Sequence, residues 1–257
     1  MTDAPILGRA DAGTGRLLVL IHAFPFAAAM WSEQISTLAQ TRRVVAVDLR
    51  GRGKTPSTPA PWSMDSHADD LARTLDDLGV EQADFAGVSM GGYIAFALWR
   101  RHAARVRSLA LIDTKPAADS PEAKQGRLDN AARARAAGTS ALVSALLPKL
   151  IAPNAAPALR QRLAAMMAAI PGETYARDLL AMAERPDSTP TLSSITVPAL
   201  VLRGAEDALV SHAEAAAMAA AMPASRLVEI AGVGHLAPLE NPSAVNEAIA
   251  SFLSTQA

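Results

Sequence analysis

The chain has 257 residues, and its 24 Lys and Arg residues nearly balance its 25 Asp and Glu residues, for a net charge of −1. This balance and the 4% aromatic content argue against nucleic acid or an anionic membrane surface as a partner. The sequence contains no cysteine, which excludes disulfides, thiolate nucleophiles and cysteine-ligated metals.

Residues 1–5 lack a basic stretch followed by an apolar segment, so no signal peptide is predicted. No apolar run approaches the about 20 residues that span a bilayer. We therefore expect a cytoplasmic protein that contacts no membrane. The sequence does not indicate an oligomeric state.

The first half of the chain alternates predicted strands with predicted helices. Continuous apolar runs predict buried strands at residues 17–22, 43–48, 83–88 and 107–112. Helical spacing of apolar residues predicts helices at residues 31–40, 66–78 and 93–101. This alternation implies right-handed crossovers and a mainly parallel α/β sheet with helices on both faces.

The character of the sequence changes between residues 115 and 190, which are rich in Ala, Leu and Met and hold no predicted strand. This stretch is far longer than an ordinary crossover, so we expect three or four short helices that form a cap over the sheet edge. We therefore divide the chain into an α/β core, residues 1–115 and 191–257, and a helical cap inserted after the strand at 107–112, residues 116–190. Further elements are then predicted at residues 197–203 (strand), 212–222 (helix), 226–230 (strand) and 243–252 (helix).

A G-x-S-x-G pattern, Gly87 to Gly91, lies where the strand at 83–88 runs into a helix. A serine at such a turn has a strained backbone that small flanking residues permit, and its hydroxyl projects from the sheet. The following helix aims its N-terminal N–H groups at the same place. Ser89 is therefore the predicted nucleophile.

A serine hydroxyl needs a base to take its proton and an acid to fix the tautomer of that base. In a parallel sheet these groups are expected just past the carboxyl ends of strands. Asp207 follows the strand at 197–203, and His235 follows the strand at 226–230. We predict a triad of Ser89, Asp207 and His235, with Glu206 and Asp113 as the rival acids.

Acyl transfer also requires donors for the oxyanion. The backbone N–H of Met90, directly after the nucleophile, is one predicted donor. The second is the N–H of Phe24, in the loop that follows the strand at 17–22. His22 is expected to shape this loop through hydrogen bonds. No cluster of His, Asp and Glu has the spacing of metal ligands, so no metal site is predicted.

Five segments together resemble the α/β-hydrolase superfamily over essentially the whole chain. They are residues 22–25, 48–53, 87–92, 204–207, and 234–235 with 240–242. Within the superfamily, the chain is similar to small bacterial esterases grouped with arylesterases, cofactor-free haloperoxidases and enol-lactonases. The resemblance implies the α/β-hydrolase fold, a triad of Ser89, Asp207 and His235, an acyl-enzyme and no cofactor. Ala23 stands where the family usually has Gly, and the segment before residue 17 is short for the usual leading hairpin.

We expect a modest apolar pocket for a small or medium ester substrate, because Met and Leu adapt to varied shapes. The predicted pocket residues are Phe26, Leu146, Met166, Leu209 and Leu236. No clustered arginines mark a carboxylate-bearing substrate, since Arg133 and Arg135 lie two apart on a helix and face different ways.

Three functions fit these residues. The first is hydrolysis of carboxylic esters or lactones through an acyl-enzyme. The second is a ligand receptor on the same fold, with negligible turnover. The third is perhydrolysis, in which hydrogen peroxide replaces water at the acyl-enzyme. Rapid turnover of an activated ester would distinguish an enzyme from a receptor.

Overall fold

The computed structural model describes residues 5–59 and 62–255. Within them, one sheet has seven strands in the order β1-β3-β2-β4-β5-β6-β7. All neighbouring strands are parallel except β1, which is antiparallel to β3. The strands are β1 (Arg9–Ala12), β2 (Leu17–Ile21), β3 (Arg43–Val47), β4 (Ala83–Val88), β5 (Val106–Ile112), β6 (Ala199–Gly204) and β7 (Ser225–Ile230). The prediction of a mainly parallel sheet is confirmed.

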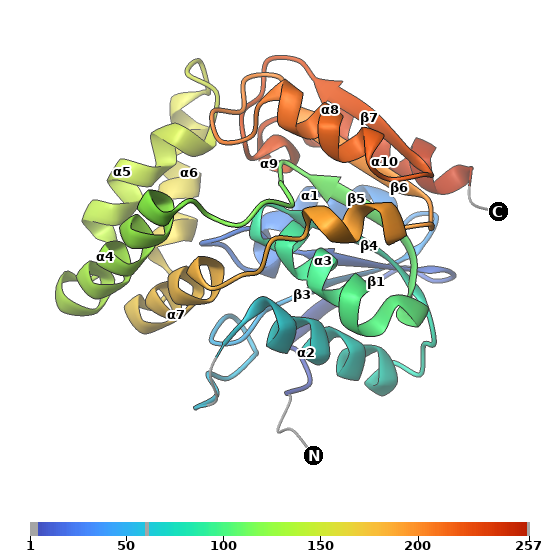
Figure 1. Ribbon diagram of the computed structural model, residues 1–257, viewed down its shortest axis with the longest axis horizontal. Helices are drawn as coiled ribbons and strands as arrows, with labels where there is room; N and C mark the ends of the chain where they lie inside the picture. The colour runs from blue at the N-terminus through green and yellow to red at the C-terminus, as the bar shows by residue number, and fades with distance from the viewer. Residues whose placement is uncertain (1–4, 60–61, 256–257) are drawn as a thin grey trace.

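Helices cover both faces of this sheet, as expected (Figure 1). Successive side chains of a strand point to opposite faces, so Val19 and Ile21 of β2 pack in one hydrophobic core while Leu18 and Leu20 pack in the other. This is why the central strands read as unbroken apolar runs. The covering helices are α1 (Ser32–Leu38), α2 (Met64–Asp77), α3 (Met90–His102), α8 (His212–Ala220) and α10 (Pro242–Ser254).

The leading strand β1 is short and half of its four residues are charged, with the sequence Arg-Ala-Asp-Ala. It pairs at the sheet edge with β3, where Arg9 lies opposite Val47 and Ala12 opposite Val44. One strand of the usual leading hairpin is therefore present. Residues 1–4, on which the signal-peptide prediction rests, lie outside the described part of the chain.

Four helices lie between β5 and β6 along the chain and gather at one side of the sheet (Figure 1, left, green to yellow). We call them the cap: α4 (Pro121–Ala137), α5 (Ser140–Leu150), α6 (Pro157–Ala168) and α7 (Gly172–Ala183). Ser120 caps α4 by accepting from the Ala123 N–H, and Pro121 occupies its first turn. The helical content matches the expectation, and the exact domain boundaries stay a prediction.

A buried ion pair ties the cap to the core. Arg52, in the loop after β3, binds the carboxylate of Asp178 on α7, and both side chains are fully buried. Thr174, also on α7, donates to the Gly51 carbonyl at 3.2 Å. The position of α7 over this loop is therefore fixed by polar contacts.

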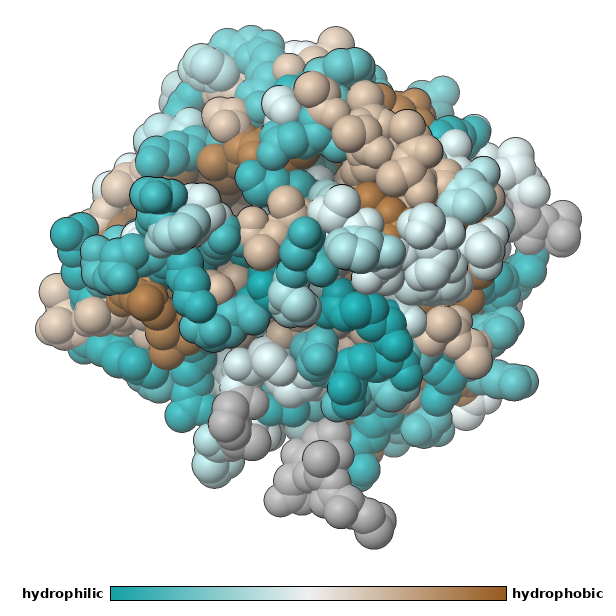
Figure 2. Space-filling model, viewed as in Figure 1, coloured by the Kyte–Doolittle hydropathy of each residue, from teal (hydrophilic) through white to brown (hydrophobic). Residues whose placement is uncertain are grey.

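The face seen in Figure 1 carries intermixed hydrophilic and hydrophobic residues, with a tan area over the alanine-rich α8 (Figure 2). Within residues 5–59 and 62–255, no helix combines the length and the apolar composition needed to cross a bilayer.

Candidate active site

Ser89 forms the turn between β4 and α3 with φ 53° and ψ −110°, one of two non-glycine residues with positive φ among those described. Its N–H donates to the Ile112 carbonyl of the neighbouring strand at 2.9 Å. The turn needs glycine on both sides. A Cβ on Gly87 would collide with the backbone of Gly91, and one on Gly91 would collide with the Ile21 carbonyl.

Ser89, His235 and Asp207 are joined by two hydrogen bonds. With its proton on Nδ1, His235 donates to Oδ2 of Asp207 at 2.8 Å and accepts the Ser89 hydroxyl at Nε2, also at 2.8 Å. His235 and Asp207 are buried, while Ser89 is partly exposed. The arrangement can therefore remove a proton from Ser89 and stabilise the resulting imidazolium.

The loop after β6 holds the carboxylate of Asp207 in place. Its Oδ1 accepts the N–H groups of Leu209 at 2.7 Å and Val210 at 3.1 Å, which leaves Oδ2 for His235. Arg203, at the end of β6, donates to the Val210 carbonyl at 2.7 Å. The rival Glu206 is exposed and does not contact His235.

Two other acids, the half-buried Glu240 and the buried Asp113, hold the loop that carries His235. Glu240 accepts from Gly234 and from Ala152 at the end of the cap helix α5, each at 2.8 Å. Asp113, just past β5, accepts from Ala237 at 3.2 Å. Burial raises the pKa of both carboxyls, and the charge of Asp207 adds to the effect at Asp113. Asp113, the second rival acid, thus bonds to backbone rather than to His235.

Of the two predicted oxyanion donors, Met90 directly follows Ser89, and Phe24 lines the same cavity as Ser89. In the described part of the chain, the N–H groups of Met90 and Phe24 have no hydrogen-bond acceptor, so both are free to receive an anion. His22, in the Phe24 loop, donates from Nδ1 to the Ala23 carbonyl at 3.0 Å and accepts from the Leu49 N–H at 3.2 Å. Burial holds the pKa of His22 well below its usual range, which suits this neutral, bridging role.

A cavity of about 600 Å³ opens between Ser89 and the cap, a volume typical of small-molecule sites. Of the five predicted pocket residues, it brings together Leu146 and Leu209. The apolar side chains that line it are Phe24, Tyr93, Leu142, Leu146, Leu150, Tyr175, Leu179, Met182, Leu209 and Val210. Tyr93 belongs to α3 of the core, and Tyr175 belongs to the cap helix α7 and packs against Phe24 with ring centroids 4.5 Å apart.

Three predicted pocket residues do not line this cavity, and these predictions are corrected. Phe26 and Leu236 are fully buried and pack into a hydrophobic core on one face of the sheet. Met166, on α6, packs against the same core. Phe26 and Leu236 lie close in the sequence to the site residues Phe24 and His235, but their own side chains pack in the core.

Charged side chains of the cap and of the segment that leads into it also line the cavity, which the sequence analysis missed. They are Lys115, Asp119, Arg127, Arg133 and Lys149. The helical spacing of Arg133 was visible in the sequence, but the presence of Lys149 from α5 in the same cavity was not. Within the part of the chain that the structure describes, no group of His, Asp and Glu is placed to hold a metal ion.

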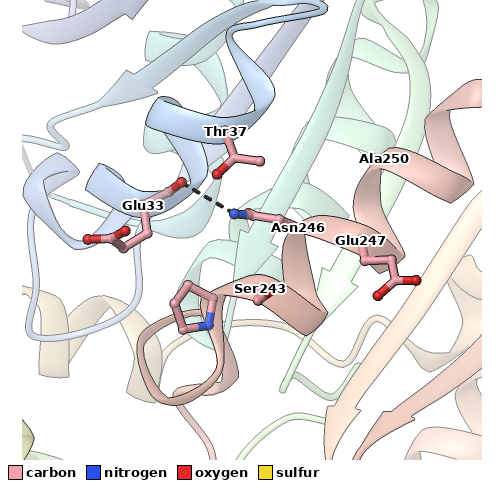
Figure 3. Close-up of a pocket in the computed structure, with 7 residues that line it drawn as sticks. Glu33, Thr37, Ser243, Asn246, Glu247 and Ala250 are labelled. Carbon is pink, nitrogen blue, oxygen red and sulfur yellow. Dashed lines mark hydrogen bonds between the residues drawn. The ribbon is translucent and has the colours of Figure 1, made fainter.

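A second hollow lies on the surface between α1 and α10, remote from the triad (Figure 3). It is lined by Glu33, Thr37, Pro242, Ser243, Asn246, Glu247 and Ala250. Asn246 lies between the helices and donates to the Glu33 carbonyl at 3.3 Å, whereas the carboxylates of Glu33 and Glu247 point apart. It holds a serine, Ser243, but no histidine that could activate it.

The sheet is mainly parallel, a strained serine lies between a strand and a helix, and Asp and His follow later strands. This is the arrangement of an α/β hydrolase. The family model described as "alpha/beta hydrolase fold" matches residues 16–242, so the chain belongs to this family. The chain is thus a hydrolase of the α/β fold. The predicted superfamily is confirmed, and its esterase, enol-lactonase and haloperoxidase relatives match the group expected.

Three similar proteins illustrate the range of relatives. A thermophilic esterase from Thermogutta terrifontis, solved with malate bound, is 38% identical with a TM-score of 0.94, over 97% of this chain and 93% of that one. The enol-lactonase from Burkholderia xenovorans LB400 is 29% identical with a TM-score of 0.89, over 96% of both chains. The carbamate hydrolase candidate RutD of Azorhizobium caulinodans is 30% identical over 93% of this chain and 92% of its own length.

Proposed function

We propose that the chain hydrolyses carboxylic esters or lactones of small to medium acyl length, with Ser89 as nucleophile. The observation that carries this proposal is the continuous hydrogen-bond chain from Ser89 through His235 to Asp207. An esterase and an enol-lactonase are among the similar structures, and esters and lactones share the acyl–oxygen bond that such a serine attacks.

In the first half of the reaction, Nε2 of His235 takes the hydroxyl proton as Ser89 Oγ bonds to the carbonyl carbon. Asp207 holds the Nδ1 proton and stabilises the imidazolium. The negative oxygen is held by the N–H groups of Phe24 and Met90, each contributing about 10²–10³ in kcat. His235 then protonates the departing alcohol, which leaves an acyl group on Ser89.

In the second half, water enters from the cavity and gives a proton to His235 as its oxygen attacks the acyl carbon. The tetrahedral oxygen again lies against Phe24 and Met90. Collapse breaks the bond to Ser89 Oγ, which regains its proton from His235, and the carboxylic acid leaves. Every step uses groups of this chain and water.

Initial rates on p-nitrophenyl acetate and butyrate test this proposal. Ser89→Ala removes the nucleophile and is expected to lower kcat by about 10⁴-fold or more. Ser243→Ala is the matched control, because it removes a hydroxyl from the second hollow and leaves the triad intact. Equal activity in wild type and Ser89→Ala would show that the nucleophile is wrong.

Two other outcomes would favour the alternatives. A single burst of p-nitrophenolate without turnover, in a folded protein, would favour a ligand receptor. Peracid formation that exceeds hydrolysis when hydrogen peroxide is added would favour a perhydrolase, since both reactions share the acyl-enzyme. The substrate class is a small molecule in all three cases, and a cytoplasmic location remains part of the proposal.

A further inference from the structure

The cavity between the cap and Ser89 is apolar in its depth and cationic at its opening. Near the triad its walls are the buried rings of Phe24, Tyr93 and Tyr175. Toward solvent it is lined by Arg133 and Lys149, which are both exposed. A ligand that fills it therefore meets an apolar wall at one end and positive charge at the other.

The positive charge in this lining is not balanced by protein carboxylates. Arg127 binds Asp119, but Asp119 is shared with Arg185 at 2.8 Å. Lys115 lies 3.4 Å from Glu214. Arg133 and Lys149 make no ion pair or hydrogen bond with any residue in the described ranges 5–59 and 62–255.

The two unpaired cations come from two different cap helices, α4 and α5, and line the same cavity. On α4, Gly126, Asn130 and Arg133 follow a spacing of four and three residues, which places them on the cavity face. Arg135 turns away and binds Glu173 on α7 instead, at 2.8 Å. The second cation of the pair is Lys149 on α5, and not another arginine of α4.

We propose that the substrate carries a carboxylate, which Arg133 and Lys149 bind at the opening of the cavity while the ester lies at Ser89. This inference rests on the proposed ester hydrolysis. It corrects the expectation that no cluster of cations marks a carboxylate-bearing substrate. An alternative is that both cations only interact with the partial negative charge at the C-terminal ends of α4 and α5. They would then affect the stability of the protein and not its selectivity for substrates.

Matched substrates that differ only in charge test the proposal. The first pair is mono-p-nitrophenyl pimelate and its methyl ester, which place the charge on the acyl side. The second pair is 4-acetoxybenzoate and its methyl ester, which place it on the alcohol side. We expect wild type to show a higher kcat/KM for the anion in at least one pair. That preference should fall about fivefold for each cation removed in Arg133→Gln and Lys149→Gln.

The neutral substrates should lose less kcat/KM than the anions in both variants. Arg162→Gln is the matched control, because Arg162 is an exposed arginine of α6 that does not line the cavity. It should leave the anion preference unchanged. Absence of a preference in both pairs, or a preference that persists in the double variant, would overturn the proposal while the neutral rates still support ester hydrolysis.

Binding of pimelate, measured by titration calorimetry, gives a readout that does not depend on turnover. We expect pimelate to bind wild type and Arg162→Gln alike and to bind the double variant at least about fivefold more weakly. Equal binding to all three proteins, or none to wild type, would overturn the carboxylate site. If the neutral esters are not hydrolysed at all, the proposed function is wrong, and this titration still decides whether the cations bind a carboxylate.

Discussion

Asp113 accepts a hydrogen bond from the N–H of Ala237, two residues beyond the catalytic candidate His235, at 3.2 Å. Its other oxygen accepts from Gly204, at the end of β6 and ahead of Asp207, at 2.7 Å. One buried carboxylate therefore braces both loops that carry the proposed acid and base. Its backbone has φ 46°, a conformation that a non-glycine residue adopts only under constraint.

Asp113→Asn replaces one of these acceptor oxygens by a donor, so one buried N–H group loses its partner. We expect a loss of about 1–3 kcal/mol in the free energy of unfolding. Displacement of the His235 loop should also lower kcat by about 10- to 100-fold. Urea denaturation and initial rates measure the two effects. Asp129→Asn, on the exposed surface of α4, is the control, and equal results for both variants would contradict the bracing role.

Gly91→Ala tests the close approach at the Ser89 turn. The added methyl group would collide with the Ile21 carbonyl, so we expect a loss of stability of about 1–3 kcal/mol. Gly126→Ala is the same substitution inside α4, where a Cβ meets nothing within 4 Å. It should raise stability by up to about 1 kcal/mol, because alanine favours a helix. Chemical denaturation that ranks the two variants in the opposite order would contradict this account.

His67 is predicted to make the protein sensitive to acid. It is fully buried with neither ring nitrogen hydrogen-bonded, and burial, with the charges of Arg52 and Arg50, lowers its pKa to about 3. Between pH 6.5 and 3 the unfolded chain binds a proton at this residue that the folded chain does not. Stability is thus lost as pH falls below about 6.5, by about 1.4 kcal/mol per pH unit.

His67→Leu removes this contribution and keeps a similar side-chain volume. The free energy of unfolding is measured in urea at pH 7, 5.5 and 4.5. As pH falls, wild type should lose more stability than the variant, so that the difference in stability shifts in favour of the variant. His22, whose pKa is also lowered, is present in both proteins and cancels in the difference. If the free energies of unfolding of the two proteins fall in parallel with pH, His67 does not cause the loss of stability in acid.

The ion pair between Arg52 and Asp178 allows a test of how the contact between the cap and the core affects stability. Asp178→Asn leaves the buried Arg52 without its ion-pair partner, so we expect a loss of about 3–5 kcal/mol. Replacing both residues, in Arg52→Met with Asp178→Leu, should recover much of that loss, because no uncompensated charge remains. Denaturation curves of the single and double variants measure the difference. A double variant less stable than Asp178→Asn would contradict it.

The central strands and the Ser89 turn were predictable because both leave a local signature. A strand buried on two faces is a short apolar run, as in residues 17–21, and the turn requires glycine at positions 87 and 91. The edge strand β1 has neither property, since half of its four residues are charged and it is only partly covered. The Asp207 and His235 contacts followed from the rule that such groups lie past strand ends.

The walls of the cavity were only partly predictable, because they depend on how the cap helices pack. Phe26 and Leu236 lie next to site residues in the sequence, yet local backbone geometry turns their side chains into the core. Arg133 on α4 and Lys149 on α5 line one cavity because of how the cap helices pack, which periodicity within one helix does not determine.

The insertion of the cap between β5 and β6 has a consequence for how the protein folds. Leu109 and Ala199 are neighbours in the sheet but stand about 90 residues apart in the chain, a separation whose closure costs about 4 kcal/mol of chain entropy. Ser89 lies on one side of this junction, and Asp207 and His235 lie on the other. Recovery of activity during refolding therefore measures the pairing of β5 with β6, a long-range and intrinsically slow step.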